Sequence, residues 1–189
     1  YFGEDPSTYG ISIIGVDGKS YAPFLMLALS LKKPFCVISD NDGDARHVVL
    51  KQLSDTERRV HSRAQDNQSG VFFLSPGLAI EGELVYKTGL KREIYDALWA
   101  CNGSTNTSPK SKHPQYERMM ALAPRDLKRK LEKKKAEYSG FLGEIIAQNP
   151  YNQSVDNMLP IAVRKAFEQI SLWLGKTKKD SETETVSYT

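Results

Sequence analysis

The chain has 189 residues, of which 40% are hydrophobic and 26% are charged, and its formal net charge is +3. This composition is ordinary for a globular domain with or without an appendage, and it excludes a low-complexity or collagen-like chain. No apolar run reaches the ~18 residues of a membrane span, and the first residues do not resemble a signal peptide. Two cysteines cannot form a disulfide framework, so a cytoplasmic location is expected.

The first part of the sequence predicts alternating strands and helices. Tyr9–Val16 is short, apolar and rich in isoleucine, which is typical of a buried strand. Ser20–Leu31 has apolar residues at helical spacing, and Pro34–Ser39 is a second apolar strand. Strand, helix and strand in this order predict a βαβ unit, and therefore an α/β fold with a parallel sheet. Because the chain starts at Tyr1 and reaches its first strand almost at once, we expect a piece of a longer protein.

The remaining sequence predicts further α/β elements and then only helices. Residues 102–114 contain no large apolar residue and predict a flexible loop. We expect a catalytic core over 1–101, a helical element over 115–175 and a polar tail over 176–189. The predicted elements are helices over Ala45–Leu53 and Asp55–Gln65, a strand over Val71–Leu74, an apolar segment over Leu78–Tyr86, and helices over Leu90–Cys101, Gln115–Leu122, Arg125–Gln148 and Asn157–Leu174.

Three aspartates follow the second predicted strand. Asp40, Asp42 and Asp44 leave its carboxyl end within five residues, at the edge where open α/β sheets bind ligands. Asp40 and Asp42 are two residues apart, so both can face one cation on an extended segment. Oxygen ligands at this density suit Mg²⁺ or Mn²⁺. The plain alternative is a polar turn, whereas a calcium EF-hand is excluded because Lys51 stands where its glutamate belongs.

An apolar strand followed by Asp-x-Asp is also typical of haloacid-dehalogenase-like phosphatases. In that interpretation Asp40 is the nucleophile and Asp42 the general acid and base. Two observations disfavour it. The motif is preceded by a βα unit, and the later aspartates are isolated from one another in the sequence.

Two further signals lie downstream. Glu81 follows the third apolar strand and can approach the aspartates if the two strands are neighbours, which would serve a second metal. The alternative is a solvent-facing glutamate on an alternating strand. Residues 125–135 hold seven basic residues against two acidic ones, a distribution that suits a nucleic-acid surface, although most such runs are solvated helix faces. Neither a zinc-ligand spacing nor a Walker A motif is present in the sequence.

The order GISIIGVDGKSYAPFLMLALSLKKPFCVISDNDGD resembles the Toprim domain of the OLD-family nucleases (overcoming lysogenization defect). In that family a strand and a Gly-Gly-Lys-like turn precede a helix, and the next strand ends in Asp-x-Asp. The resemblance implies a Toprim-like parallel sheet flanked by helices, with a C-terminal helical element. It also implies that the family's upstream glutamate and an ABC-type ATPase domain precede this segment, since Glu4 does not fit the position of that glutamate.

The resemblance implies roles for individual residues. Asp40 and Asp42 match the metal-binding aspartates, with Asp44 beside them, and Glu81 matches the later acidic ligand, although the family's preceding aspartate is Ala79 here. Lys135 fits the catalytic lysine, with Lys133 and Lys134 close by. The residues expected to bind DNA are Lys19, Arg125, Lys128, Lys130 and Lys134.

The activity that the resemblance implies is a two-metal DNA endonuclease that serves phage defence or DNA processing. One Mg²⁺ or Mn²⁺ held by Asp40 and Asp42 would activate water, and a second held by Glu81 would stabilise the leaving oxygen. The implied partners are DNA, the upstream ATPase domain and a second copy of the chain, with no membrane. A non-catalytic nucleic-acid-binding or assembly module and the phosphatase remain the alternatives.

Overall fold

The computed structural model describes residues 5–16, 18–101, 114–148 and 158–175. These residues form two compact units, which are described separately below. The first comprises described residues up to Gly77 together with those from Ile161 onward, and the second lies between them, from Leu78 to Pro160. This grouping by contacts places residues 78–101 with the later helices.

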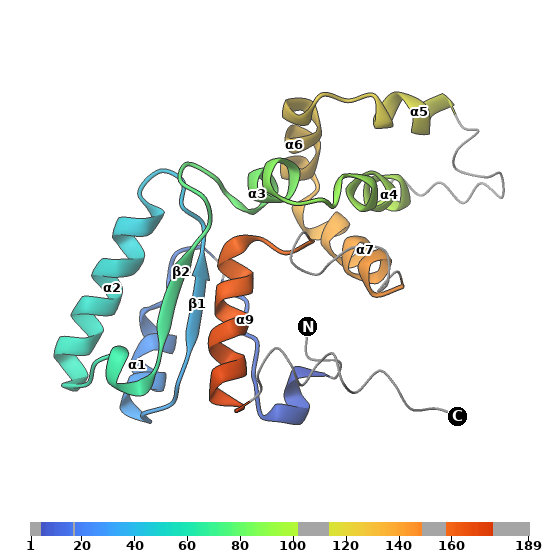
Figure 1. Ribbon diagram of the computed structural model, residues 1–189. Coiled ribbons are helices and arrows are strands. Elements are labelled where there is room, and N and C mark those ends of the chain that lie inside the picture. Colours follow the sequence, from blue (N-terminus) through green and yellow to red (C-terminus); the bar gives the residue numbers. More distant parts are fainter. Residues whose placement is uncertain (1–4, 17, 102–113, 149–157, 176–189) are drawn as a thin grey trace, which may run out of the picture. The chain divides into compact units, whose positions relative to one another are not determined.

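A two-stranded parallel sheet forms the centre of the first unit (Figure 1). Strand β1 (Cys36–Ser39) pairs with β2 (Gly70–Phe73), and Cys36 lies opposite Gly70. Helix α2 (Ala45–Val60) connects the two strands and contacts β1, while α1 (Ala22–Ser30) packs on α2. The expected α/β architecture with a parallel sheet is therefore confirmed, with β1, α2 and β2 as its βαβ unit.

Helix α9 (Ile161–Trp173) packs against both strands of the sheet. Val37 belongs to a small core with Leu25 of α1 and Val49 of α2. Its neighbour Cys36 instead places its sulfur 3.8 Å from the carbonyl oxygen of Ala166 in α9. Because successive side chains of a strand point to opposite faces, α9 covers the face opposite α1 and α2.

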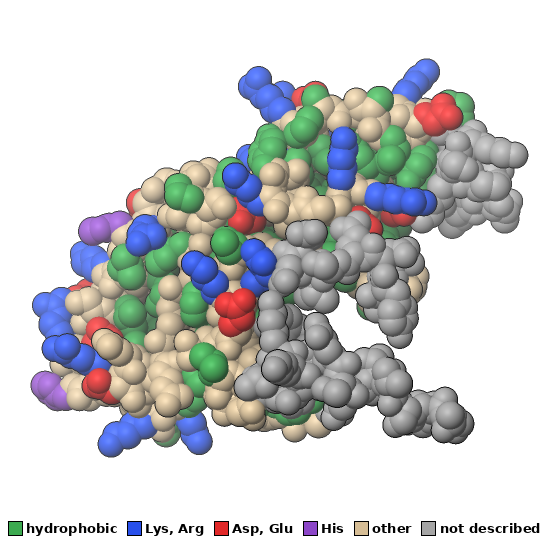
Figure 2. Space-filling model, in the orientation of Figure 1, with side chains coloured by type: hydrophobic (Ala, Val, Ile, Leu, Met, Phe, Trp, Pro, Cys, Tyr) green, Lys and Arg blue, Asp and Glu red, His purple; other side chains and the backbone are tan. Residues whose placement is uncertain are grey.

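The predicted first strand is absent from the structure. Tyr9, the first residue of the predicted strand, belongs to a short 3-10 helix, η1 (Pro6–Tyr9). Residues Ile11–Val16 form no strand. Ile13 and Ile14 are 78% and 57% exposed. A strand needs a hydrogen-bonded neighbour, and the described part of the chain supplies none for this segment. Figure 2 shows that hydrophobic side chains lie on the surface among charged ones.

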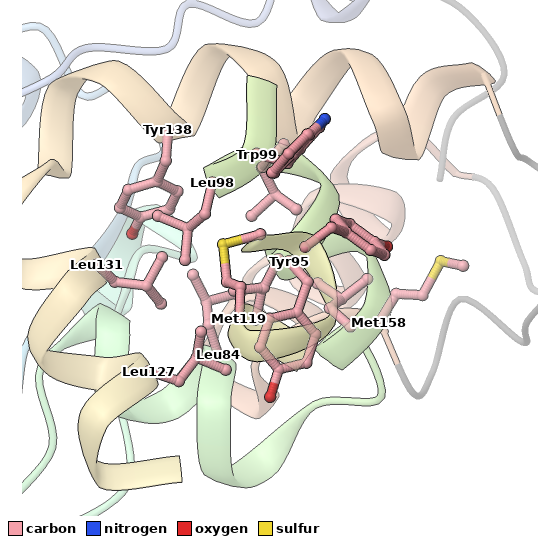
Figure 3. Close-up of a cluster of buried hydrophobic side chains, with 14 residues drawn as sticks. Leu84, Tyr95, Leu98, Trp99, Met119, Leu127, Leu131, Tyr138 and Met158 are labelled. Carbon is pink, nitrogen blue, oxygen red and sulfur yellow. The ribbon is translucent and has the colours of Figure 1, made fainter. Parts of the chain in front are cut away.

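The second unit is entirely helical in its described residues. Its helices are α3 (Ile80–Lys87), α4 (Lys91–Cys101), α5 (Pro114–Met120), α6 (Pro124–Lys133) and α7 (Lys135–Gln148). They share one core (Figure 3), in which Tyr95 and Leu98 of α4 lie beside Leu127 and Leu131 of α6. Trp99 meets Tyr116 edge-on, with ring centroids 5.5 Å apart. No helix among the described residues is long and apolar enough to cross a membrane.

Other expected elements differ in their bounds. Helix α2 is continuous where two helices were predicted. It ends at Val60, and the next residue, His61, caps it with a left-handed φ of 51°. The long helix predicted over Arg125–Gln148 is two helices that meet at Lys134. The predicted loop over 102–114 and the tail over 176–189 lie almost wholly outside the described residues.

Candidate metal and nucleic-acid site

The aspartate segment is tied to the end of the neighbouring strand. Ser39 is buried, and its carbonyl oxygen accepts a hydrogen bond from the Leu74 N–H at 3.0 Å. The Asn41 amide donates to the Leu74 carbonyl oxygen at 2.9 Å, and the Asn41 carbonyl oxygen accepts from the Gly77 N–H at 2.8 Å. Because both loops are held together, Asp40 leaves β1 on a fixed path.

Asp42 and Asp44 form the entry to helix α2. The Asp42 carbonyl oxygen accepts from the Ala45 N–H at 3.1 Å, and Gly43 between the two aspartates has a left-handed φ of 52°. Asp44 occupies the N-cap position without capping the helix through its side chain. Negative charge at this end of a helix is favoured by the helix dipole.

The Asp44 side chain contacts Lys19 instead. Its Oδ1 lies 2.5 Å from the Lys19 Nζ. The hydrogen bond to Asp44 raises the pKa of Lys19, and the charges of Asp44, Asp42 and Asp40 add to the rise. The same bond lowers the pKa of Asp44. The contact between Lys19 and Asp44 joins the turn before α1 to the segment that follows the Asp-x-Asp.

Gln52 was not identified from the sequence. Its amide nitrogen donates to the Lys19 carbonyl oxygen at 2.6 Å, and its amide oxygen accepts from the Ala22 N–H at 2.8 Å. These two bonds hold the Lys19 turn and the start of α1 against α2. The sequence feature that could have indicated Gln52 is its position eight residues after Asp44, a little more than two turns along the predicted helix.

Glu81 lies on a helix and not on the alternating strand of the plain alternative. It belongs to the first turn of α3, and both Glu81 and Glu83 are only 1% exposed. The solvent-facing alternative for Glu81 is therefore wrong. Glu81 lines a cavity of about 440 Å³ whose other walls come mainly from apolar residues of α3 and α7. Burial raises the pKa of Tyr138 in this cavity to about 12, with a further contribution from the charge of Glu81.

Lys128 of α6 lies near Glu81. Its side chain lies close to Gly82, because a Cβ built there would stand 3.4 Å from the Lys128 Cε, an ordinary van der Waals distance. The hydrogen bond to Glu132 raises the pKa of Lys128, and the charge of Glu81 contributes to the rise. The second unit thus places a cation from the basic run near the buried Glu81.

The other members of the basic run are distributed over two helices. Arg125 and Lys130 are exposed on α6, and Lys134 forms an ion pair with Glu137 at 3.3 Å. Lys135 begins α7, and its side chain lies outside the described part of the structure. Lys and Arg side chains project from the surface over α5 and α6 in Figure 2.

A second basic surface, on α2, was missed by the sequence analysis. Lys, Arg and His side chains line the outer side of this helix in Figure 2. Arg46, two residues after Asp44, stands over the Phe73 ring with its guanidinium carbon 4.8 Å from the centroid. The signal was present as basic residues in the two helices predicted over Ala45–Leu53 and Asp55–Gln65, which form one helix in the structure. These residues are Arg46, His47, Lys51, Arg58 and Arg59, all of them exposed.

The carboxylates fit a hard divalent cation in their chemistry. Asp40 and Asp42 are half-buried in the first unit, and Glu81 is buried in the second. Oxygen donors of this kind suit Mg²⁺ or Mn²⁺. Within the described residues, no three acidic, histidine or cysteine side chains are gathered closely enough to hold a metal.

Comparison with known proteins links the site to a family. Residues 1–42 match the family model described as "Overcoming lysogenization defect protein-like, TOPRIM domain". No curated protein and no solved structure matches the chain. The matched residues include Lys19, Asp40 and Asp42 and end before Glu81 and the basic run. Toprim domains occur in nucleic-acid-processing enzymes of the nuclease and primase type. Residues 1–42 of this chain are therefore similar to part of an OLD-family Toprim domain.

Proposed function

We propose that this chain is the nuclease part of an OLD-like protein and hydrolyses DNA phosphodiester bonds with Mg²⁺ or Mn²⁺. The observation that carries the proposal is the position of Asp40 and Asp42. Both follow a parallel strand at its carboxyl end, on a segment pinned to the next strand, inside the residues that match the Toprim family. That edge of a parallel sheet is where α/β enzymes place their ligands.

In this proposal Asp40 and Asp42 of the first unit hold one cation, with Asp44 beside them. Glu81 of the second unit is a ligand of the second cation. Bound Mg²⁺ or Mn²⁺ supplies Lewis-acid polarisation of the phosphate and a lowered pKa for water.

The basic residues have a separate role in the proposal. Lys135 neutralises charge that develops on the scissile phosphate. The DNA backbone is bound by Lys19 in the first unit and by Arg125, Lys128, Lys130 and Lys134 in the second. Exposed positive charges on both α2 and α6 support this assignment, since phosphate binding requires such surfaces.

A non-catalytic nucleic-acid-binding module is the second candidate. The observation in its favour is that Arg125 and Lys130 are exposed on α6 and could bind phosphates without any cation. It predicts salt-sensitive DNA binding and no cleavage.

The test is nicking of supercoiled plasmid by the chain in Mg²⁺ or Mn²⁺. We expect Asp42→Ala and the isosteric Glu81→Gln to reduce nicking at least ~100-fold, because each removes an interaction needed for metal-assisted hydrolysis. DNA binding, measured by fluorescence anisotropy in the same buffer, should stay within about threefold of the wild type.

Asp66→Asn is the matched control, because Asp66 is an exposed aspartate of η2 (Gln65–Asn67) in the first unit. It should nick like the wild type. Unchanged nicking by Asp42→Ala would overturn the assignment of the site. DNA binding without cleavage, both in this chain and in a longer one that includes the upstream segment, would favour the binding module.

A further inference from the structure

Helix α2 is buried on one side and basic on the other. Its buried residues are Ala45, Val49 and Thr56, which share one side of the helix. At about 3.6 residues per turn, the positions directly opposite belong to four exposed polar residues. These residues, called the outer stripe below, are His47, Lys51, Ser54 and Arg58. The outer stripe therefore lies away from the small core that Val49 shares with α1 and β1.

The acidic side chains of α2 leave the outer stripe positively charged. The Glu57 carboxylate accepts a hydrogen bond from the Ala64 N–H at 2.8 Å, so it is engaged with the chain that follows the helix. Asp55 pairs with Arg58, but both side chains are exposed, and such a pair is weak enough for a phosphate to compete with it. Within the described residues, Lys51 forms no ion pair.

The composition of the outer stripe favours the backbone of double-stranded DNA. Lysine, arginine and serine side chains are among those that contact phosphate oxygens in protein–DNA complexes. The outer stripe holds no apolar residue, whereas the centre of a protein–protein interface is apolar and poor in charge. Helix α2 also contains no Phe, Tyr or Trp on which the bases of a single strand could stack.

The outer stripe extends away from the aspartate segment along one continuous helix. Because α2 begins directly after Asp44 and rises ~1.5 Å per residue, Lys51 and Arg58 lie about 10 and 21 Å from Asp44 along the helix axis. Each DNA strand carries one phosphate per ~3.4 Å of its axis. For a duplex that lies along α2, the two cations reach phosphates about three and six base pairs from the aspartate segment.

We propose that the outer stripe of α2 binds the phosphate backbone of double-stranded DNA to one side of the bond that is cut. The position of the cut bond rests on the proposed function, whereas the binding of the duplex does not. The DNA-binding residues expected from the sequence include none on α2, so the outer stripe is an additional surface. Its residues are positioning residues, because they contact phosphates remote from the reacting one.

The test is binding of the full chain to a duplex of ~20 base pairs in EDTA, measured by fluorescence anisotropy over a salt series. The double variant Lys51→Gln and Arg58→Gln removes two charges and keeps a good helix former at both positions. The slope of log affinity against log salt should fall by about 2. A single strand of the same length should lose less affinity than the duplex does.

Lys33→Gln combined with Lys165→Gln is the charge-matched control. Both lysines are exposed in the first unit, Lys33 before the amino end of β1 and Lys165 on α9, which covers the other face of the sheet. The slope of this variant should stay within ~0.5 of the wild type. An unchanged slope in the α2 variant, an equal fall in the control, or equal losses for duplex and single strand would each overturn the inference.

Nicking of supercoiled plasmid separates this inference from the proposed function. The α2 variant should raise KM and leave kcat within about twofold of the wild type, because contacts remote from the reacting phosphate are equal in the ground and transition states. If the wild type nicks and the α2 variant keeps the wild-type KM and salt slope, the inference fails and the nuclease stands. If the wild type binds the duplex through α2 but never nicks, the nuclease fails and the DNA surface stands.

Discussion

Gln52 holds two backbone groups from another part of the chain, and it shows how much one side chain contributes to this site. The Ala22 N–H belongs to the first turn of α1, where helix donors have no partner within the helix. The Lys19 carbonyl oxygen lies in the turn before it. One amide therefore caps α1 and orients the turn that carries Lys19.

Replacement of Gln52 should destabilise the first unit. Gln52→Leu keeps the size of the side chain and removes both hydrogen bonds, so we expect the free energy of unfolding to fall by about 1–2 kcal/mol. Urea unfolding would measure it as a lower midpoint with an unchanged slope. Gln65→Leu, at an exposed position of the same unit, should change the free energy of unfolding by less than ~0.5 kcal/mol. Equal effects of the two variants would contradict the assigned role.

At the scale of elements, helix α6 has its apolar residues on one side and its basic residues on the other. Leu127 and Leu131 are 1% and 0% exposed and face the core, whereas Arg125 and Lys130 are exposed. This is the pattern of an amphipathic helix with a basic outer side. Its apolar side can be predicted from the spacing of the leucines. The end of α6 at Lys134 could not, because the run of lysines continues through it without a helix-breaking residue.

The outer side of α6 should bind DNA without supporting the fold. For the double variant Arg125→Ala and Lys130→Ala, we expect the slope of log affinity against log salt to fall by about 2, because each removed cation leaves one phosphate without its neutralising partner. Its free energy of unfolding should stay within ~0.5 kcal/mol of the wild type. Fluorescence anisotropy over a salt series checks the first expectation. An unchanged slope would remove α6 from the DNA surface.

Two segments show what local pattern cannot decide. Ile11–Val16 has the composition of a strand, but pairing decides whether a strand forms, and the described residues give it no partner. Ile80–Lys87 alternates apolar and acidic residues over a short stretch, which suits a strand or a helix equally. In the structure this segment is the helix α3, which packs against α6 and places Leu84 in the core.

At the scale of the whole molecule, each unit has its own core and its own tryptophan. Trp99 lies in the core of the second unit, and Trp173 of α9 donates a hydrogen bond to the Gln68 carbonyl oxygen in the first. The chain contains two tryptophans in total. Their fluorescence can therefore report the unfolding of each unit separately.

A cavity made in one core should affect mainly the tryptophan of that unit. Leu131→Ala should lower the stability reported by Trp99 by about 2–5 kcal/mol, since Leu131 is fully buried. In the Trp99→Phe background, the transition reported by Trp173 should shift by less than ~0.5 kcal/mol. Urea unfolding of the two single-tryptophan variants measures both values. Equal shifts would show that the two cores unfold as one cooperative unit.

The local chemistry of this protein was determined by its sequence. Strand β1, the Asp-x-Asp that follows it and the basic run are recognisable because each depends on neighbouring residues. The βαβ unit predicted over residues 9–39 is replaced by one made of β1, α2 and β2. The tertiary structure decided what depends on distant partners. It placed Lys19 against Asp44 and Gln52 against the Lys19 turn, and it buried Glu81 on a helix, because those contacts join residues far apart in the chain and no local pattern encodes them.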